Sequence, residues 1–215
     1  MAPPAPKDLV IFDLGGVLVR IRHGLVACAE AIGVSLDEKS MMAADTEEVA
    51  GVMDSYQAGK MNLADFSRTL SRALDGVCSP EQVEAMHHEV LLGPYAGAEE
   101  LVAELQRGGT ATAILSNTCA VHWQVLQHYR AIAAISPKSW YLSFELGYAK
   151  PTPMIYEQVE HLSGRRPEEI VFVDDNPSNV KAAADRGWRA KEIPAERDGM
   201  GEVLTALRSL GIAGV

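Results

Sequence analysis

Two short apolar runs in this chain each end in aspartate, and they constrain the fold more than any other feature. One run is Leu9-Val-Ile-Phe-Asp13, and the other is Ile170-Val-Phe-Val-Asp174-Asp175. Continuous runs of β-branched and aromatic residues are typical of strands that are buried on both faces. Such strands form parallel α/β sheets, which bind ligands at the carboxyl ends of their strands. The sequence therefore predicts that the three aspartates converge on one crevice.

Carboxylates that lie this close repel one another unless a cation or a shared proton separates them. Mg²⁺, a hard cation with oxygen ligands, is the usual solution. A third apolar run ends in Ser116-Asn117-Thr118, and Lys150 lies in a loop that leads into a helix. A nucleophilic carboxylate, a hydroxyl, an ammonium group and an acidic pair together predict a phosphate-handling site.

Each of these residues has a plainer reading when it is taken alone. Asp13 would cap a turn, Ser116 would bond to the local backbone, and Lys150 would be a solvated surface lysine. Asp174 and Asp175 would cap the helix that starts at Pro177. The functional reading depends on all of the segments occurring together.

In this order the segments match four sequence motifs of a known family. They are Phe12-Asp13-Leu14-Gly15-Gly16-Val17, Leu115-Ser116-Asn117, Lys150-Pro151 and Val173-Asp174-Asp175. The chain resembles the haloacid dehalogenase (HAD) superfamily over nearly its whole length, in the phosphatase-like branch that carries a helical cap. A single motif is weak evidence, but four in order are specific.

The resemblance implies a role for each residue. Asp13 is expected to be the nucleophile, and Ser116 and Lys150 are expected to take part in catalysis by binding the phosphoryl group. Asn117 and Gly16 are expected to add phosphate contacts. The expected Mg²⁺ ligands are Asp13, the Gly15 carbonyl and the acidic pair, with the choice between Asp174 and Asp175 left open.

The expected function is a Mg²⁺-dependent phosphatase of a small phosphorylated metabolite, such as a sugar phosphate, acting through an aspartyl-phosphate intermediate. Many HAD phosphatases carry a general acid where this chain has Gly15. Three accounts stay open: a substrate with a good leaving group, a proton donor elsewhere in the cap or substrate, or a protein that mainly binds its ligand.

Two rival functions follow from this departure. A metal-independent 2-haloacid dehalogenase would carry tyrosine at Gly15 and lack the acidic pair. A non-catalytic, phospho-ligand-binding protein would need no general acid at all. Intact motifs at the other positions favour the phosphatase.

Composition limits the partners. The 215 residues carry a formal net charge of −10, which argues against nucleic acid and anionic membranes as partners. No apolar run reaches transmembrane length, and no signal peptide is predicted. The cysteines form no CxxC pair, so neither a zinc site nor a disulfide framework is predicted. Reduced thiols are typical of a cytoplasmic protein. The chain is expected to be a monomer or a homodimer.

The predicted fold is a doubly wound, Rossmann-like parallel α/β core, residues 1–19 and 93–215, with a small all-helical cap at 20–92. Cap helices are expected at about 23–32 and 37–57, after Asn62, and at a capping box that begins at Ser79. No strand is expected between Asp13 and the run at 111–115. One helix is expected over about 119–130.

The remaining polar residues have open or plain readings. His87 and His88 are predicted to lie on a partly exposed helix face, and Cys119 is predicted to be a small buried residue. His122 either packs or contacts substrate. Arg20, Arg22 and His23 either reach the substrate from the cap hinge or are solvated.

Overall fold

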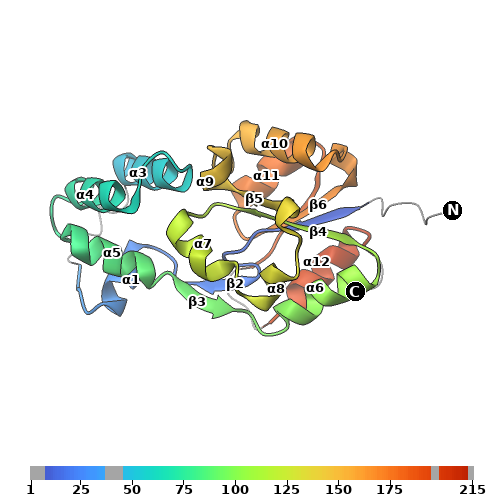
Figure 1. The fold of residues 1–215 in the computed structure, drawn as a ribbon, viewed down its shortest axis with the longest axis horizontal. Helices are drawn as coiled ribbons and strands as arrows, with labels where there is room; N and C mark the ends of the chain where they lie inside the picture. Colours follow the sequence, from blue (N-terminus) through green and yellow to red (C-terminus); the bar gives the residue numbers. More distant parts are fainter. Residues whose placement is uncertain (1–7, 37–45, 195–198, 213–215) are drawn as a thin grey trace.

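The computed structural model describes residues 8–36, 46–194 and 199–212, and within them it forms a central sheet of five parallel strands. In spatial order the strands are β5 (Trp140–Leu142), β4 (Ala111–Ser116), β1 (Leu9–Phe12), β6 (Ile170–Asp174) and β7 (Arg189–Glu192). β1 lies between β4 and β6, so the two runs that end in aspartate are direct neighbours (Figure 1). The predicted α/β fold is confirmed.

Side chains of the central strands alternate between two hydrophobic clusters, one on each face of the sheet. Val10 and Phe12 belong to one cluster, whereas Leu9 and Ile11 belong to the other. The first face is covered by α6 (Ala98–Arg107), α7 (Ala120–Leu126), α8 (Arg130–Ala133) and α12 (Gly201–Ser209), and the second by α10 (Pro153–Ser163) and α11 (Pro177–Asp185). Figure 1 shows the two helical layers on either side of the strands. Burial on both faces explains why the strand sequences are continuously apolar.

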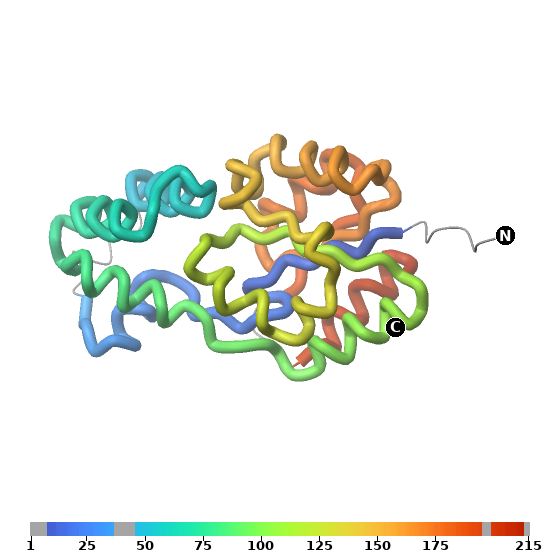
Figure 2. Tube along the Cα trace, viewed as in Figure 1, coloured from blue at the N-terminus to red at the C-terminus, as the bar shows by residue number. Residues whose placement is uncertain are grey.

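Along the sequence, a group of helices lies between β1 and α6, and we call it the helical insertion. It contains α1 (Leu25–Ala31), α3 (Glu47–Gln57), α4 (Leu63–Ala73) and α5 (Pro80–His88). These helices share a hydrophobic cluster of their own, which also takes in Cys119 of the core. Figure 2 shows the insertion to one side of the sheet, beside its carboxyl-terminal edge. The domain boundaries at 20 and 92 stay predictions.

Local signals placed the insertion helices well. Asn62 caps α4, and the predicted capping box at Ser79 and Gln82 is present in full. The helix expected at 37–57 is found as α3, which Thr46 caps, while residues 37–45 lie outside the described part of the chain. No helix within the described residues is long and apolar enough to cross a membrane.

Two predictions about the strands and helices were wrong. The segment expected to lack strands contains β2 (Val19–Ile21) and β3 (Leu91–Pro94), an antiparallel pair that connects the insertion to the core. These strands lack the continuous apolar run that marks β1, and pairing between distant segments stabilises them. The single helix expected at 119–130 is two helices, α7 and α8, with a turn between them.

Candidate active site

Lys150 lies between two aspartates at the carboxyl ends of β1 and β6. Its Nζ is 2.9 Å from Asp13 Oδ1 and 2.5 Å from Asp174 Oδ2, and it donates a 3.0 Å hydrogen bond to the Leu115 carbonyl. Asp13 follows β1 directly, and its N–H donates to the Val173 carbonyl of β6. All three charged side chains are buried. The fold therefore brings together residues that are far apart in the sequence, as the strand pattern predicts.

The two neighbouring carboxylates at the end of β6 have different surroundings. Asp174 Oδ1 accepts from the Asn176 N–H and from Asn179 Nδ2, and Oδ2 accepts from Lys150 and Asn179 Nδ2. A carboxylate has about four acceptor positions, so those of Asp174 are occupied. Asp175 is less buried and lines an open hollow beside Asp13. One oxygen of each of the three aspartates lies within 4.8 Å of the others.

Burial and mutual repulsion oppose full ionisation of this cluster. Burial raises the pKa of Asp13 to about 7; Lys150 opposes the rise, and Asp174 adds to it. Burial and then the Asp174 carboxylate also raise the pKa of Asp175. Burial alone would lower the pKa of Lys150, but the two carboxylates that it contacts raise it overall. One ammonium group does not balance three carboxylates, and an all-oxygen donor set with excess negative charge fits Mg²⁺.

Ser116 and Asn117 lie where β4 ends, on the same side of the sheet. Ser116 is buried and lines a cavity beside Gly15. The Asn117 side chain forms two 2.8 Å hydrogen bonds with the Lys150 backbone, in which Nδ2 donates to the carbonyl and Oδ1 accepts from the N–H. Asn117 therefore fixes the loop that carries Lys150.

The two glycines after Asp13 are tightly surrounded. Gly16 has a φ of +68°, and a side chain there would collide with the Asp175 carboxylate. At Gly15, a Cβ would lie 2.9 Å from Ile21 Cδ1. The apolar side chain of Ile21, from β2, thus fills the space next to the position where the family resemblance expects a general acid.

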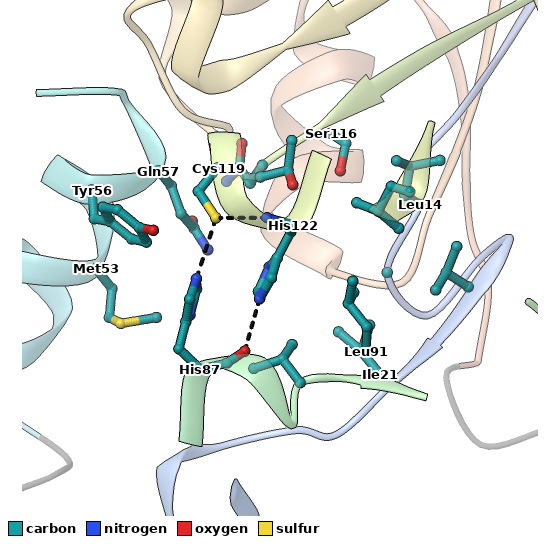
Figure 3. Close-up of a pocket in the computed structure, with 16 residues that line it drawn as sticks. Leu14, Ile21, Met53, Tyr56, Gln57, His87, Leu91, Ser116, Cys119 and His122 are labelled. Carbon is teal, nitrogen blue, oxygen red and sulfur yellow. Dashed lines mark hydrogen bonds between the residues drawn. The ribbon is translucent and has the colours of Figure 1, made fainter. Parts of the chain in front are cut away.

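A cavity of about 120 Å³ lies next to Ser116, between the core and the helical insertion (Figure 3). Its lining includes Leu14, Gly15, Ser116, Thr118, Cys119 and His122 from the core, and Met53, Tyr56, Gln57 and His87 from the insertion. The buried hydroxyls of Tyr56 and Thr118 have no hydrogen-bond partner among the described residues. Pockets for drug-sized ligands are several times larger, so the occupant of this cavity is small.

Comparison with known proteins gives the family. The sequence model of the haloacid dehalogenase-like hydrolase family matches residues 7–187 of this chain. The chain therefore belongs to this family and is a HAD-like hydrolase.

Relatives of known structure or activity are similar over most of their length. A D-ribitol-5-phosphate phosphatase from Bacteroides thetaiotaomicron is 24% identical over 211 residues, which cover 93% of this chain and 98% of that protein. A HAD family enzyme from the same organism, solved with magnesium and inorganic phosphate, has a TM-score of 0.70 and 26% identity, with 89% and 96% coverage of the two chains. A predicted HAD-like family hydrolase from Porphyromonas gingivalis has a TM-score of 0.73 and 25% identity, with 95% and 98% coverage.

Several residues of the site were not predicted. Asn179, on the first turns of α11, holds both oxygens of Asp174, and Ile21 fills the space beside Gly15. Tyr56 and Gln57 reach the cavity from α3. Asn179 carried a weak signal, since a buried amide in a helix needs polar partners. Ile21, Tyr56 and Gln57 carried none, because a residue that faces a cavity has the same sequence pattern as one that faces the core.

Proposed function

We propose that this chain is a Mg²⁺-dependent phosphatase that acts on a small polyhydroxylated metabolite, such as a sugar phosphate or a sugar-alcohol phosphate. The position of the Lys150 ammonium between Asp13 and Asp174, with Asp175 beside them, carries the proposal. Family membership supports hydrolysis. The name of the Bacteroides relative supports the phosphate ester class and suggests a linear polyol as the alcohol.

In this mechanism Asp13 attacks phosphorus in line, and the alcohol leaves. Water then hydrolyses the aspartyl-phosphate. Ser116 and Lys150 hold the phosphoryl oxygens, and Asp174 and Asn117 position Lys150 rather than touch the substrate. Gly16 adds backbone contact with the phosphoryl group.

Asp13, the Gly15 carbonyl and Asp175 would hold the metal ion. We choose Asp175 over Asp174 because the acceptor positions of Asp174 are already occupied by Lys150, Asn176 and Asn179. When bound, Mg²⁺ offsets the negative charge of the phosphoryl group and of the carboxylates. It also favours the ionised form of Asp13 that a nucleophile requires.

The cavity beside Ser116 receives the leaving group, and the helical insertion, residues 20–92, acts as a cap over it. Tyr56 and Thr118 offer buried hydroxyls without partners, and Gln57 offers an amide. These groups suit an alcohol that carries further hydroxyls, because unpaired buried polar groups are costly until a ligand satisfies them. Closure of a cap excludes water from the reacting atoms.

His23 is our candidate for the proton donor that is absent at Gly15. Ile21 fills the space beside Gly15, and His23, two residues farther along the same segment, lines the open hollow with Asp13, Lys150 and Asp175. His23 also opposes the rise in the pKa of Asp175. Among the titratable groups that line this hollow, it alone is neither in the Lys150 ion pairs nor in the acidic cluster. Imidazole is also the side chain that exchanges protons near neutral pH.

The two rival functions have less support. A metal-independent dehalogenase would not need three converging carboxylates, because without a cation they repel one another. A non-catalytic binding protein has no use for a buried lysine held against Asp13. Both rivals are separated from the phosphatase by metal-dependent turnover.

The test is phosphate release from linear sugar-alcohol phosphates, sugar 1-phosphates, an acyl phosphate and an aryl phosphate. Each compound is assayed with Mg²⁺, with EDTA and with the Asp13→Asn variant. The matched control is Asp185→Asn, which changes an exposed aspartate of α11. We expect release that requires both Mg²⁺ and Asp13. The absence of release from every compound by folded, Mg²⁺-binding protein would exclude the phosphatase.

The role of His23 is tested separately with His23→Gln. We expect a loss of about 10²- to 10⁴-fold in kcat for alkyl phosphates and little loss for an aryl phosphate, whose leaving group needs no proton. His88→Gln, an exposed histidine on α5, is the control. Equal losses on both substrate types would assign His23 to another role.

A further inference from the structure

A second cluster of metal-binding residue types lies across the boundary between core and insertion. His87 lies in the last turn of α5, Cys119 is the N-cap of α7, and His122 lies in the first turn of α7. His87 Nε2 is 3.3 Å from Cys119 Sγ, and the two imidazole rings stack with centroids 4.0 Å apart (Figure 3). One donor atom from each residue lies within 4.8 Å of the other two. His87 was expected to be partly exposed, but it is buried because His122 covers it.

The hydrogen bonds of His122 leave one ring nitrogen free to bind a cation. His122 Nε2 is 2.8 Å from the His87 carbonyl oxygen, which can only accept, so Nε2 carries the hydrogen. Burial lowers the pKa of His122 and keeps the ring neutral, so Nδ1 keeps its lone pair. Histidines that bind metal ions usually donate their other N–H to a carbonyl or carboxylate in this way.

Cys119 Sγ contacts His87 Nε2 and accepts from the His122 N–H. Burial raises the pKa of its thiol, but the hydrogen bond with His87 and the N–H of His122 outweigh burial and lower the pKa overall. Burial likewise lowers the pKa of His87, so this ring is neutral. One hydrogen bond joins Cys119 Sγ to His87 Nε2, and a cation can replace its proton.

We propose that Cys119, His87 and His122 bind a borderline or soft divalent cation, with Zn²⁺ as the best match. One thiolate and two imidazoles are ligands that Zn²⁺ prefers and Mg²⁺ does not. On binding, the Cys119 thiol loses its proton to solvent, and a bond from sulfur to the metal replaces the shared hydrogen bond. The three residues line the cavity together with the buried Tyr56 hydroxyl.

The location predicts an effect on the enzyme. The cluster lines the same cavity as Ser116 and joins α5 of the insertion to α7 of the core. A metal ion there would fix the insertion against the core, and it would occupy the space that our mechanism assigns to the leaving group. We expect Zn²⁺ to inhibit turnover; this consequence, though not the binding itself, rests on the proposed function.

The binding test uses Co²⁺ as a spectroscopic probe in the full-length protein, with excess Mg²⁺ present to fill the acidic site. We expect one equivalent of Co²⁺ to give thiolate-to-metal charge-transfer absorption and the visible bands of tetrahedral Co²⁺, both removed by one equivalent of Zn²⁺. Cys119→Ser and His122→Asn should each weaken binding by at least about 100-fold. Cys28→Ser and Cys78→Ser, which alter the other two buried thiols, should bind like the wild type.

Two outcomes would overturn the proposal: no charge-transfer band in folded wild-type protein, or a band that persists in Cys119→Ser. If circular dichroism shows that a variant is unfolded, the wild type still provides a test. In the wild type, Zn²⁺ should protect one thiol from alkylation. The inhibition assay measures the Zn²⁺ effect on wild type, Cys28→Ser and Cys119→Ser, each relative to its own rate without Zn²⁺; we expect inhibition in the first two and its loss in Cys119→Ser. Failure of the proposed function would leave the spectroscopic result unchanged, so the two failures are distinguishable.

Discussion

The buried carboxyl group of Asp13 should make the metal-free protein less stable as the pH rises. Its pKa is raised from 3.8 to about 7 in the folded state. For an acid with a raised folded-state pKa, the stabilising contribution is complete below the unfolded pKa and is lost as the pH rises through the folded pKa. The perturbation that isolates this effect is Asp13→Asn, because the amide has a similar shape and does not titrate.

The size of the effect follows from the two pKa values. A difference of about three pKa units corresponds to about 4 kcal/mol of unfolding free energy. Roughly 2.5 kcal/mol of this falls between pH 5 and pH 8, because at pH 5 the unfolded state has already lost part of its protons. For a chain of this length the change amounts to about 5–10 °C in Tm.

The assay is urea unfolding in EDTA at pH 5 and pH 8, with wild type, Asp13→Asn and the exposed control Asp185→Asn. We expect Asp13→Asn to gain about 2.5 kcal/mol relative to wild type between the two pH values, and the control to gain almost nothing. Mg²⁺ at pH 8 should restore the stability of the wild type more than that of the variant. Parallel pH dependence in wild type and Asp13→Asn would refute the reasoning.

Three further predictions concern the residues that support the site. Gly16→Ala should weaken Mg²⁺ binding in calorimetry and destabilise the fold by about 1–3 kcal/mol. The loss of stability should be larger than that of Gly76→Ala, because Gly76 has a similar φ but open space around it. Asn117→Ala should lower kcat about 30-fold with little change in KM, because two hydrogen bonds that position Lys150, worth roughly 1 kcal/mol each, are lost; an unchanged kcat would contradict this role. Asn179→Leu should cost about 1–3 kcal/mol in thermal unfolding, because the buried Asp174 carboxylate loses its amide donor.

The core of the fold was predictable because its strands are buried on both faces. Such strands have a continuous apolar sequence, and the polar residue that follows each one must lie at the same edge of a parallel sheet. Asp13, Ser116 and Asp174 could therefore be placed in one crevice without any contact information. β2, β3 and β5 were missed because none of them is a continuous run of four apolar residues like β1, and they form through pairing with distant segments.

The cavity was not predictable for a related reason. Tyr56 and His87 lie on helices of the insertion, and an amphipathic face is the same whether it meets a hydrophobic cluster or a ligand. His87 is buried because aromatic rings from other parts of the chain, those of Tyr56, Phe66 and His122, lie against it. The spacing of the cysteines gave no indication of a metal site, since the ligands in the second cluster come from two separate helices.

The segment from Ser116 to His122 links the two candidate sites. At its start, Ser116 faces the phosphoryl group in our mechanism, and at its end Cys119 and His122 contact the insertion through His87. Ser143 reinforces the link, since its hydroxyl accepts from the Thr118 N–H and donates to the Gln57 carbonyl of α3. A movement of α5 or α3 would act through these hydrogen bonds on the segment that begins with Ser116. Insertion position and phosphoryl binding should be coupled for this reason, whichever ligand occupies the cavity.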